Sequence, residues 1–135
     1  MRIFILEDDH ERIAIFRRKL IGHELVVAET AQQAINILGT HKDGRTRRSL
    51  FDLIFLDHDL GGQQFVSASD KNTGSEVVRW MILEMGHCPP IIVHSLNTVE
   101  APVMVWDLSA ARFECHRIPF DSLLVRLDDP DFITQ

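Results

Sequence analysis

The sequence predicts an α/β domain with a parallel five-stranded sheet covered by helices on both faces. The segment Phe51-Asp-Leu-Ile-Phe-Leu56 carries an almost unbroken apolar run. A run of this kind, bounded by turn residues, is typical of a strand buried on both faces. Similar short runs alternate along the chain with amphipathic segments of helical period. This alternation predicts the order βαβαβαβαβα and therefore a parallel sheet.

Length and composition limit the classes of protein. The chain has 135 residues, of which 45% are hydrophobic and 25% are charged, so we expect one globular domain over residues 1–135. A net charge of −6 argues against a partner such as duplex DNA, which selects a basic surface. A nucleotide or a protein remains a candidate partner.

The sequence also bears on the cellular location. The apolar run after Arg2 ends at Glu7, which is unlike a signal peptide, and we find no apolar segment of membrane length. Cys88 and Cys115 lie far apart and form no C-x-x-C motif, which indicates reduced thiols. We expect a cytoplasmic protein that does not bind membranes.

The first half of the chain predicts three strands and two helices. Asp9 or Asp8 can cap the first helix, Gly22 is its expected stop, and Thr30 is a good N-cap for a second helix that Gly39 closes. The expected elements are a strand over 3–6, a helix over 11–20, a weaker strand over 24–28, a helix to residue 38 and the strand over 51–56.

The second half predicts three helices and two strands. Thr73-Gly-Ser-Glu76 matches a capping box, and Asn97 or Thr98 can cap the next helix. The expected elements are a helix over 74–85, a strand over 91–93, a helix through Leu108, an edge strand over 113–118 and a helix from Asp121 through Leu127. The loop over 61–74 is too long for an ordinary βα connection, and such loops beside a site are often lids.

Acidic residues follow two of the predicted strands directly. Glu7-Asp-Asp9 ends the first strand, and Asp57-His-Asp59 ends the third. Ligands bind at the carboxyl ends of strands in open α/β sheets. Because neighbouring carboxylates raise each other's pKa, a cation is the simplest compensation. The arginine-rich loop over 41–48 enters at the opposite edge, where we expect it to be solvated.

These residues resemble the receiver domain of bacterial response regulators over almost the whole chain. The likeness rests on the segment 2–9, on Asp57, on Ser95 and on Pro119-Phe120. It implies a flavodoxin-like, doubly wound sheet of order 2-1-3-4-5. The family's roles carry over residue by residue: Glu7 and Asp8 match its magnesium-holding acids, Asp57 its phospho-accepting aspartate and Ser95 its switch hydroxyl, and Asp59 falls where the family offers a carbonyl to the metal.

Departures from the receiver pattern point to a divergent branch. Ile118 stands where the family has a lysine that grips the phosphoryl group, with Arg117 one residue earlier. Lys71 or Arg117 could supply that charge, although solvated surface positions are the simpler interpretation. The segments 56–62 and 94–97, with Met104, resemble the cyclic-phosphate processing receiver domains. This resemblance implies a protein that handles cyclic or terminal phosphates.

The site predicted from these residues has several parts. Glu7, Asp8, Asp57 and Asp59 are the candidate ligands of Mg²⁺ or Mn²⁺, and Asp9 and His58 are expected to support them from behind. His94 is the candidate general acid or base, although a strand-end histidine alone is more often structural. Ser95 and Asn97 are candidate phosphate donors, with a plain helix cap as the alternative for Asn97. Strand alternation turns His58 away from Asp57.

Three hypotheses for the function follow. The first is a metal-dependent protein that binds or processes a phosphate ester, such as the cyclic phosphate of a nucleotide end, with Asp57 and His94 as catalytic residues of a phosphoesterase. The second is a signalling switch phosphorylated at Asp57, with a protein partner on the fourth helix and fifth strand. The third is a pseudo-receiver that only binds a partner. Ile118 weakens the second, and the cluster of acids and imidazoles weakens the third.

Overall fold

The computed structural model describes residues 1–62 and 65–133, in which strands and helices alternate along the chain. The strands are β1 (Arg2–Leu6), β2 (Glu24–Ala28), β3 (Leu53–Leu56), β4 (Ile91–Val93) and β5 (Cys115–Arg117). The helices are α1 (His10–Lys19), α2 (Ala31–Thr40), α3 (Gly74–Glu84), α4 (Glu100–Ala110) and α5 (Phe120–Leu127).

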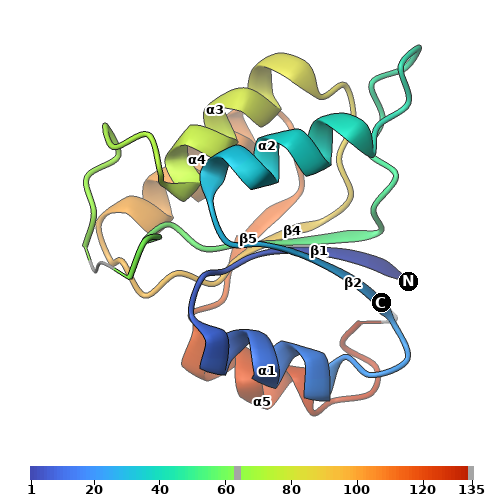
Figure 1. The fold of residues 1–135 in the computed structure, drawn as a ribbon, viewed down its shortest axis with the longest axis vertical. Helices are drawn as coiled ribbons and strands as arrows, with labels where there is room; N and C mark the ends of the chain where they lie inside the picture. The colour runs from blue at the N-terminus through green and yellow to red at the C-terminus, as the bar shows by residue number, and fades with distance from the viewer. Residues whose placement is uncertain (63–64, 134–135) are drawn as a thin grey trace.

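The five strands form one parallel sheet in the order β2-β1-β3-β4-β5, as predicted. Figure 1 shows α1 and α5 on one face of the sheet and α2, α3 and α4 on the other. The carboxyl ends of β1 and β3 are neighbours, with Leu6 opposite Leu56 in the register. The acids that follow these two strands therefore start side by side.

Side-chain alternation along the strands divides the core into two clusters. Ile5 and Phe55 pack toward α1 and α5 with Phe16, whereas Phe4 and Ile54 pack toward α2, α3 and α4. All of these side chains are fully buried. The same alternation continues past the strand ends, so that Glu7, Asp57 and His94 fall on the α1–α5 side and His58 falls on the other.

Three side chains cap helices as the sequence predicted. Asp9 accepts hydrogen bonds from the backbone of Glu11 and Arg12, and Thr30 caps α2 in the same way. Thr73 accepts one from the backbone N–H of Glu76. Glu76 pairs with Arg79.

Several boundaries differ from the predicted ones by a few residues. Gly39 lies inside the last turn of α2, which continues to Thr40, so it does not stop the helix as predicted; the Trp80 ring lies 3.4 Å from where a Cβ would stand. The last strand is shorter than expected. The final helix begins at Phe120, directly after Pro119, and not at Asp121.

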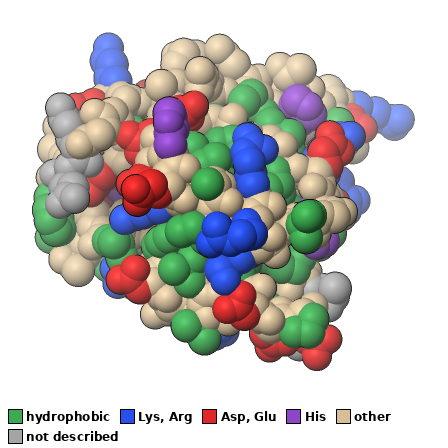
Figure 2. Space-filling view, turned by 60° about the horizontal axis from the view of Figure 1, so that its bottom comes forward, with side chains coloured by type: hydrophobic (Ala, Val, Ile, Leu, Met, Phe, Trp, Pro, Cys, Tyr) green, Lys and Arg blue, Asp and Glu red, His purple; other side chains and the backbone are tan. Residues whose placement is uncertain are grey.

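Two long connections lie at opposite ends of the sheet. The arginine-rich segment 41–50 projects from the amino edge, and the loop between β3 and α3 curls over the carboxyl edge (Figure 1). Figure 2 brings the α1–α5 side forward and shows Lys and Arg side chains near the middle of that face, with Asp and Glu side chains around them. In the described part of the chain, no helix is long and apolar enough to cross a membrane.

Candidate functional site

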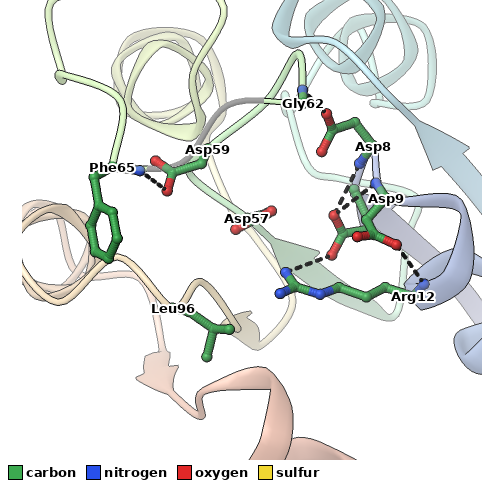
Figure 3. Close-up of a pocket in the computed structure, with 9 residues that line it drawn as sticks. Asp8, Asp9, Arg12, Asp57, Asp59, Gly62, Phe65 and Leu96 are labelled. Atoms are coloured by element: carbon green, nitrogen blue, oxygen red, sulfur yellow. Dashed lines mark hydrogen bonds and ion pairs between the residues drawn. The ribbon is translucent and has the colours of Figure 1, made fainter.

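A pocket opens at the carboxyl edge of the sheet, over the ends of β1 and β3. Its volume is about 290 Å³. It is lined by acidic side chains from both strand ends, by one arginine of α1 and by two apolar residues: Glu7, Asp8, Asp9, Arg12, Asp57, Asp59, Gly62, Phe65 and Leu96. The acids predicted from the two strand ends therefore do meet in one hollow that is open to solvent (Figure 3).

Glu7, Asp57 and His94 form the one group among the described residues whose side chains could hold a metal ion together. Each offers one ligand atom, and these atoms all lie within 4.8 Å of one another. Glu7 and His94 are fully buried, and Asp57 is 3% exposed. Two carboxylate oxygens and one imidazole nitrogen are ligands that Mn²⁺ or Mg²⁺ accepts, with water completing the shell.

His94 lies behind Glu7, within an aromatic box. Its Nε2 is 3.1 Å from Oε1 of Glu7, and its ring packs against Phe16, Phe55 and Phe120. Its Nδ1 is buried and has no hydrogen-bond partner among the described residues. The ring is absent from the described lining of the pocket, so a proton on Nε2 passes to Glu7 before it can pass to a ligand in the pocket.

The pKa values of the two central carboxyl groups move in opposite directions. Burial raises the pKa of Asp57 to about 7, and the charge of Glu7 adds to that rise against the opposing charges of His94 and Arg12. Burial would also raise the pKa of Glu7. The hydrogen bond and charge of His94 outweigh it, and the pKa of Glu7 lies below its usual value. An additional cation beside Asp57 would relieve its buried charge.

Asp8 and Asp59, both expected as metal ligands, use their carboxylates to hold the loop after β3. Asp8 Oδ2 accepts a hydrogen bond of 2.7 Å from the backbone N–H of Gly62. Asp59 accepts from the backbone of Phe65 and Val66 and from the side chain of Asn97. Burial would raise the pKa of Asp59, but the hydrogen bond from His58, together with those from Asn97, Phe65 and Val66, outweighs burial and lowers the pKa. Both acids still line the pocket.

Of the remaining predicted residues, Ser95, Asn97 and His58 lie outside the described lining of the pocket, and Asp9 lines it. Ser95 is 1% exposed and its hydroxyl accepts the backbone N–H of Asn97. The side-chain oxygen of Asn97 accepts hydrogen bonds from the backbone N–H groups of Val99 and Glu100. These bonds match the alternative that Asn97 caps the following helix. His58 faces the opposite side of the sheet, as alternation predicts, and its Nδ1 is 2.8 Å from Asp59. Asp9 caps α1 while it lines the pocket.

Arg12 is the site residue that sequence reasoning missed. Its Nη1 is 3.7 Å from Oε1 of Glu7, and its guanidinium lies 5.0 Å from the centre of the Phe120 ring. It thus brings a positive charge to the pocket whose family lysine is replaced by Ile118. Its position was a usable signal, because the first turn of a helix that follows a parallel strand starts at the carboxyl edge.

Arg117, the other candidate for that charge, points elsewhere. Its guanidinium donates a 3.4 Å hydrogen bond to the backbone oxygen of Ser95, and its Nε is buried without a partner among the described residues. Lys71 is exposed in the loop after β3. Within the described lining of the pocket, Arg12 is the cation.

Comparison with known families and structures places this geometry in context. The sequence profile of the cyclic-phosphate processing receiver domain matches residues 1–109. A comparison with curated protein sequences finds no match.

Solved receiver domains share the fold. The phosphorylated cyanobacterial phytochrome response regulator RcpA is 20% identical, with a TM-score of 0.67 over 96% of this chain and 90% of that chain. The Mn²⁺-bound response regulator Rcp1 is 17% identical, with a TM-score of 0.60 over 96% and 91%. TrrA of Thermotoga maritima, in complex with Mg²⁺-BeF, is 18% identical, with a TM-score of 0.60 over 94% and 96%. At these identities the likeness shows the fold alone.

Proposed function

Because the chain belongs to the cyclic-phosphate processing receiver domains, we propose that it binds a divalent metal ion and, with that ion, binds or processes a phosphate ester such as a cyclic phosphate. One observation carries the proposal. The ligand atoms of Glu7, Asp57 and His94 lie within 4.8 Å of one another, and Glu7 and Asp57 line an open pocket that also contains Arg12.

The donor set of this cluster fits a divalent ion. Glu7 and Asp57 are buried carboxylates whose mutual repulsion contributes to the raised pKa of Asp57, and a bound cation would offset it. As a ligand, the imidazole of His94 would have to exchange its hydrogen bond to Glu7 for the ion, and a nitrogen ligand would favour Mn²⁺ over Mg²⁺. The structures of Rcp1 with Mn²⁺ and of TrrA with Mg²⁺-BeF, which share this fold, support the proposal of a divalent ion. A divalent ion supplies Lewis-acid polarisation of a phosphoryl oxygen.

The protein side chains then bind and orient the ester. Arg12 is braced by Glu7 and by the ring of Phe120, and its guanidinium matches two phosphoryl oxygens at once. Asp57 is either a metal ligand or the group that accepts the phosphoryl. His94 holds Glu7 in place through Nε2, so its proposed part in proton transfer runs through that carboxylate. Hydrolysis of a cyclic ester would add water at phosphorus and break one ring P–O bond.

A phospho-accepting switch is the second candidate function. The observation that favours it is the position of Asp57, which ends β3 beside Arg12 in an open pocket. The replacement of the family lysine by Ile118 weighs against it. Ser95 would report phosphorylation in this scheme, through the backbone of Asn97 at the start of α4.

Parallel incubations with two phosphate donors test the proposal. The protein is mixed with Mg²⁺ or Mn²⁺ and either a 2′,3′-cyclic nucleotide or acetyl phosphate. Wild type, Asp57→Asn and His94→Ala are compared with Asp107→Asn, a charge-matched control on the exposed side of α4. Metal-dependent binding or turnover of the cyclic nucleotide that is lost in Asp57→Asn supports the proposed function. Stable labelling of Asp57 by acetyl phosphate supports the switch, and no response to either donor contradicts both.

A further inference from the structure

The pocket has two chemically different walls. Figure 3 shows Asp8, Asp9 and Arg12 on one side of Asp57, and on the other side Phe65 and Leu96 together with the carboxylate of Asp59, which bonds to the backbone of Phe65. The first wall matches a phosphoryl group with its metal ion. The second wall offers an aromatic ring and a branched aliphatic chain at the mouth of the same hollow. An ester that fills the pocket therefore meets an apolar surface beyond its phosphate.

Phe65 adopts a backbone conformation that is unfavourable for a bulky residue. Its φ is 54°, in the left-handed region, where a bulky residue is an outlier. The side chain is 67% exposed, so the fold gains little from burying the ring. Residues kept in such conformations cluster at ligand-binding sites, because the surrounding structure must impose the strain.

The carboxylate of Asp59 holds the backbone of Phe65 and the side chain of Asn97, the neighbour of Leu96. Asp59 accepts hydrogen bonds of 2.7 Å from the backbone N–H of Phe65 and 3.0 Å from that of Val66. It also accepts one of 3.0 Å from Nδ2 of Asn97, which follows Leu96 directly in the chain. Leu96 is 38% exposed. The loop after β3 and the turn after β4 are thus joined behind the wall.

We propose that Phe65 and Leu96 form a stacking wall for a planar aromatic group of the ester, so that the ligand is a mononucleotide whose base lies on Phe65. This inference rests on the proposed function, because the phosphate must lie at Arg12 and the acid cluster for the base to reach the wall. The volume of about 290 Å³ stands at the lower end of ligand pockets, about 300–1,000 Å³, and suits one small ligand.

An aromatic base fits this wall better than an aliphatic group does. A phenyl ring stacks on the π-face of any base, and such stacking tolerates different bases. A planar base can cover the face of a partly exposed ring in one contact, which adds the geometric preference of stacked rings to the burial of apolar area. The wall here consists of Phe65 and Leu96 at an open mouth.

Two cyclic phosphates that differ in the attached group test the wall. Adenosine 2′,3′-cyclic phosphate carries a base, and glycerol 1,2-cyclic phosphate presents the same five-membered ring without one. Their affinities are measured by calorimetry in the presence of Mn²⁺ for wild type, Phe65→Ala, Phe65→Trp and Leu96→Ala. Trp106→Ala removes an aromatic side chain that is 76% exposed outside the described pocket lining, and serves as the matched control.

We expect Phe65→Ala to lower the affinity for adenosine cyclic phosphate by about 5- to 150-fold, the range of base–aromatic stacking. The affinity for the glycerol ester should not change. Phe65→Trp should retain or improve the nucleotide affinity, and Trp106→Ala should change neither ligand. Wild type that binds the glycerol ester as tightly as the nucleotide overturns the stacking wall and leaves the proposed function standing. Wild type that binds Mn²⁺ but neither ester overturns both.

Discussion

Glu7 and His94 face each other across the sheet with 3.1 Å between Oε1 and Nε2, and solvent reaches neither side chain. A carboxylate can only accept, so Nε2 carries the shared proton. Asp57 lies beside this pair and responds to both of its members. Burial is the largest cause of the raised pKa of Asp57, and the two members of the Glu7–His94 pair adjust that pKa in opposite directions.

Substitutions in the pair should move the pKa of Asp57 in opposite directions. Glu7→Gln removes a negative neighbour, so we expect the pKa of Asp57 to fall below about 7. His94→Gln removes a group whose charge lowers that pKa, so we expect a rise. The NMR chemical shift of the Asp57 carboxyl carbon, followed against pH, measures the pKa in both variants, and Asp107→Asn serves as the control. Movement in the same direction in both variants would contradict the arrangement.

The stability of the metal-free protein should depend on pH through Asp57. Its pKa is raised from 3.8 to about 7 in the folded state. The favourable contribution of the protonated form is complete below pH ~4 and is lost as pH rises to ~7. Asp57→Asn cannot ionise at this position. Between pH 4 and 7, its free energy of unfolding, measured in urea, should therefore rise relative to that of wild type. A difference that is constant with pH would show that Asp57 titrates normally.

Metal affinity should follow the same titration with the opposite sign. A divalent ion binds the ionised carboxylate and must displace the proton of Asp57. We expect the affinity for Mn²⁺ to rise about tenfold per pH unit below pH 7 and to level off above it. Calorimetry at several pH values measures this slope. A flat profile between pH 5 and 7 would contradict an Asp57 ligand whose pKa is raised to about 7.

Much of the site follows from two regularities of the chain. Acids directly after two neighbouring buried strands predict that Glu7, Asp8 and Asp57 share one edge of the sheet, and strand alternation predicts that His58 points away from Asp57. Both predictions depend only on the backbone of regular strands. For this reason they do not depend on the paths of the loops, which the sequence does not define.

Other features depend on contacts that no local pattern encodes. Asp59 matches a metal-binding position of the family, yet its carboxylate holds Phe65, Val66 and Asn97. That use depends on the path of the loop after β3. Arg12 is one of three arginines in α1, and its contacts with Glu7 and Phe120 hold it at the pocket. The location of this protein in the cytoplasm and a partner on α4 and β5 stay predictions.

The strain at Phe65 should be measurable as stability. Asn tolerates the left-handed region far better than an aromatic residue does. Because the ring is 67% exposed, we expect Phe65→Asn to raise the free energy of unfolding by about 1 kcal/mol, although it removes the stacking surface. Phe65→Val, which is β-branched, should be less stable than Phe65→Asn in urea unfolding. The reverse order would mean that Phe65 is not strained.

Gly74 should tolerate no side chain. A Cβ there would stand 2.0 Å from the backbone oxygen of Asp57, which no rotamer change can relieve. We expect Gly74→Ala to lower the free energy of unfolding by about 3 kcal/mol or to shift the start of α3 away from the site. Gly44→Ala, where a Cβ meets nothing within 4 Å, is the control and should stay within about 0.5 kcal/mol of wild type. Equal effects of the two substitutions would contradict this packing.

The most direct test of the central claim is Mn²⁺ binding itself, followed at pH 8 by the electron paramagnetic resonance signal of the free ion. We predict one site in wild type and in Asp107→Asn. Affinity should drop by at least about tenfold in both Glu7→Gln and Asp57→Asn, because the two carboxylates come from separate strands and hold one ion. Mn²⁺ binding that is unchanged in these two variants, with their fold intact by circular dichroism, would contradict the claim.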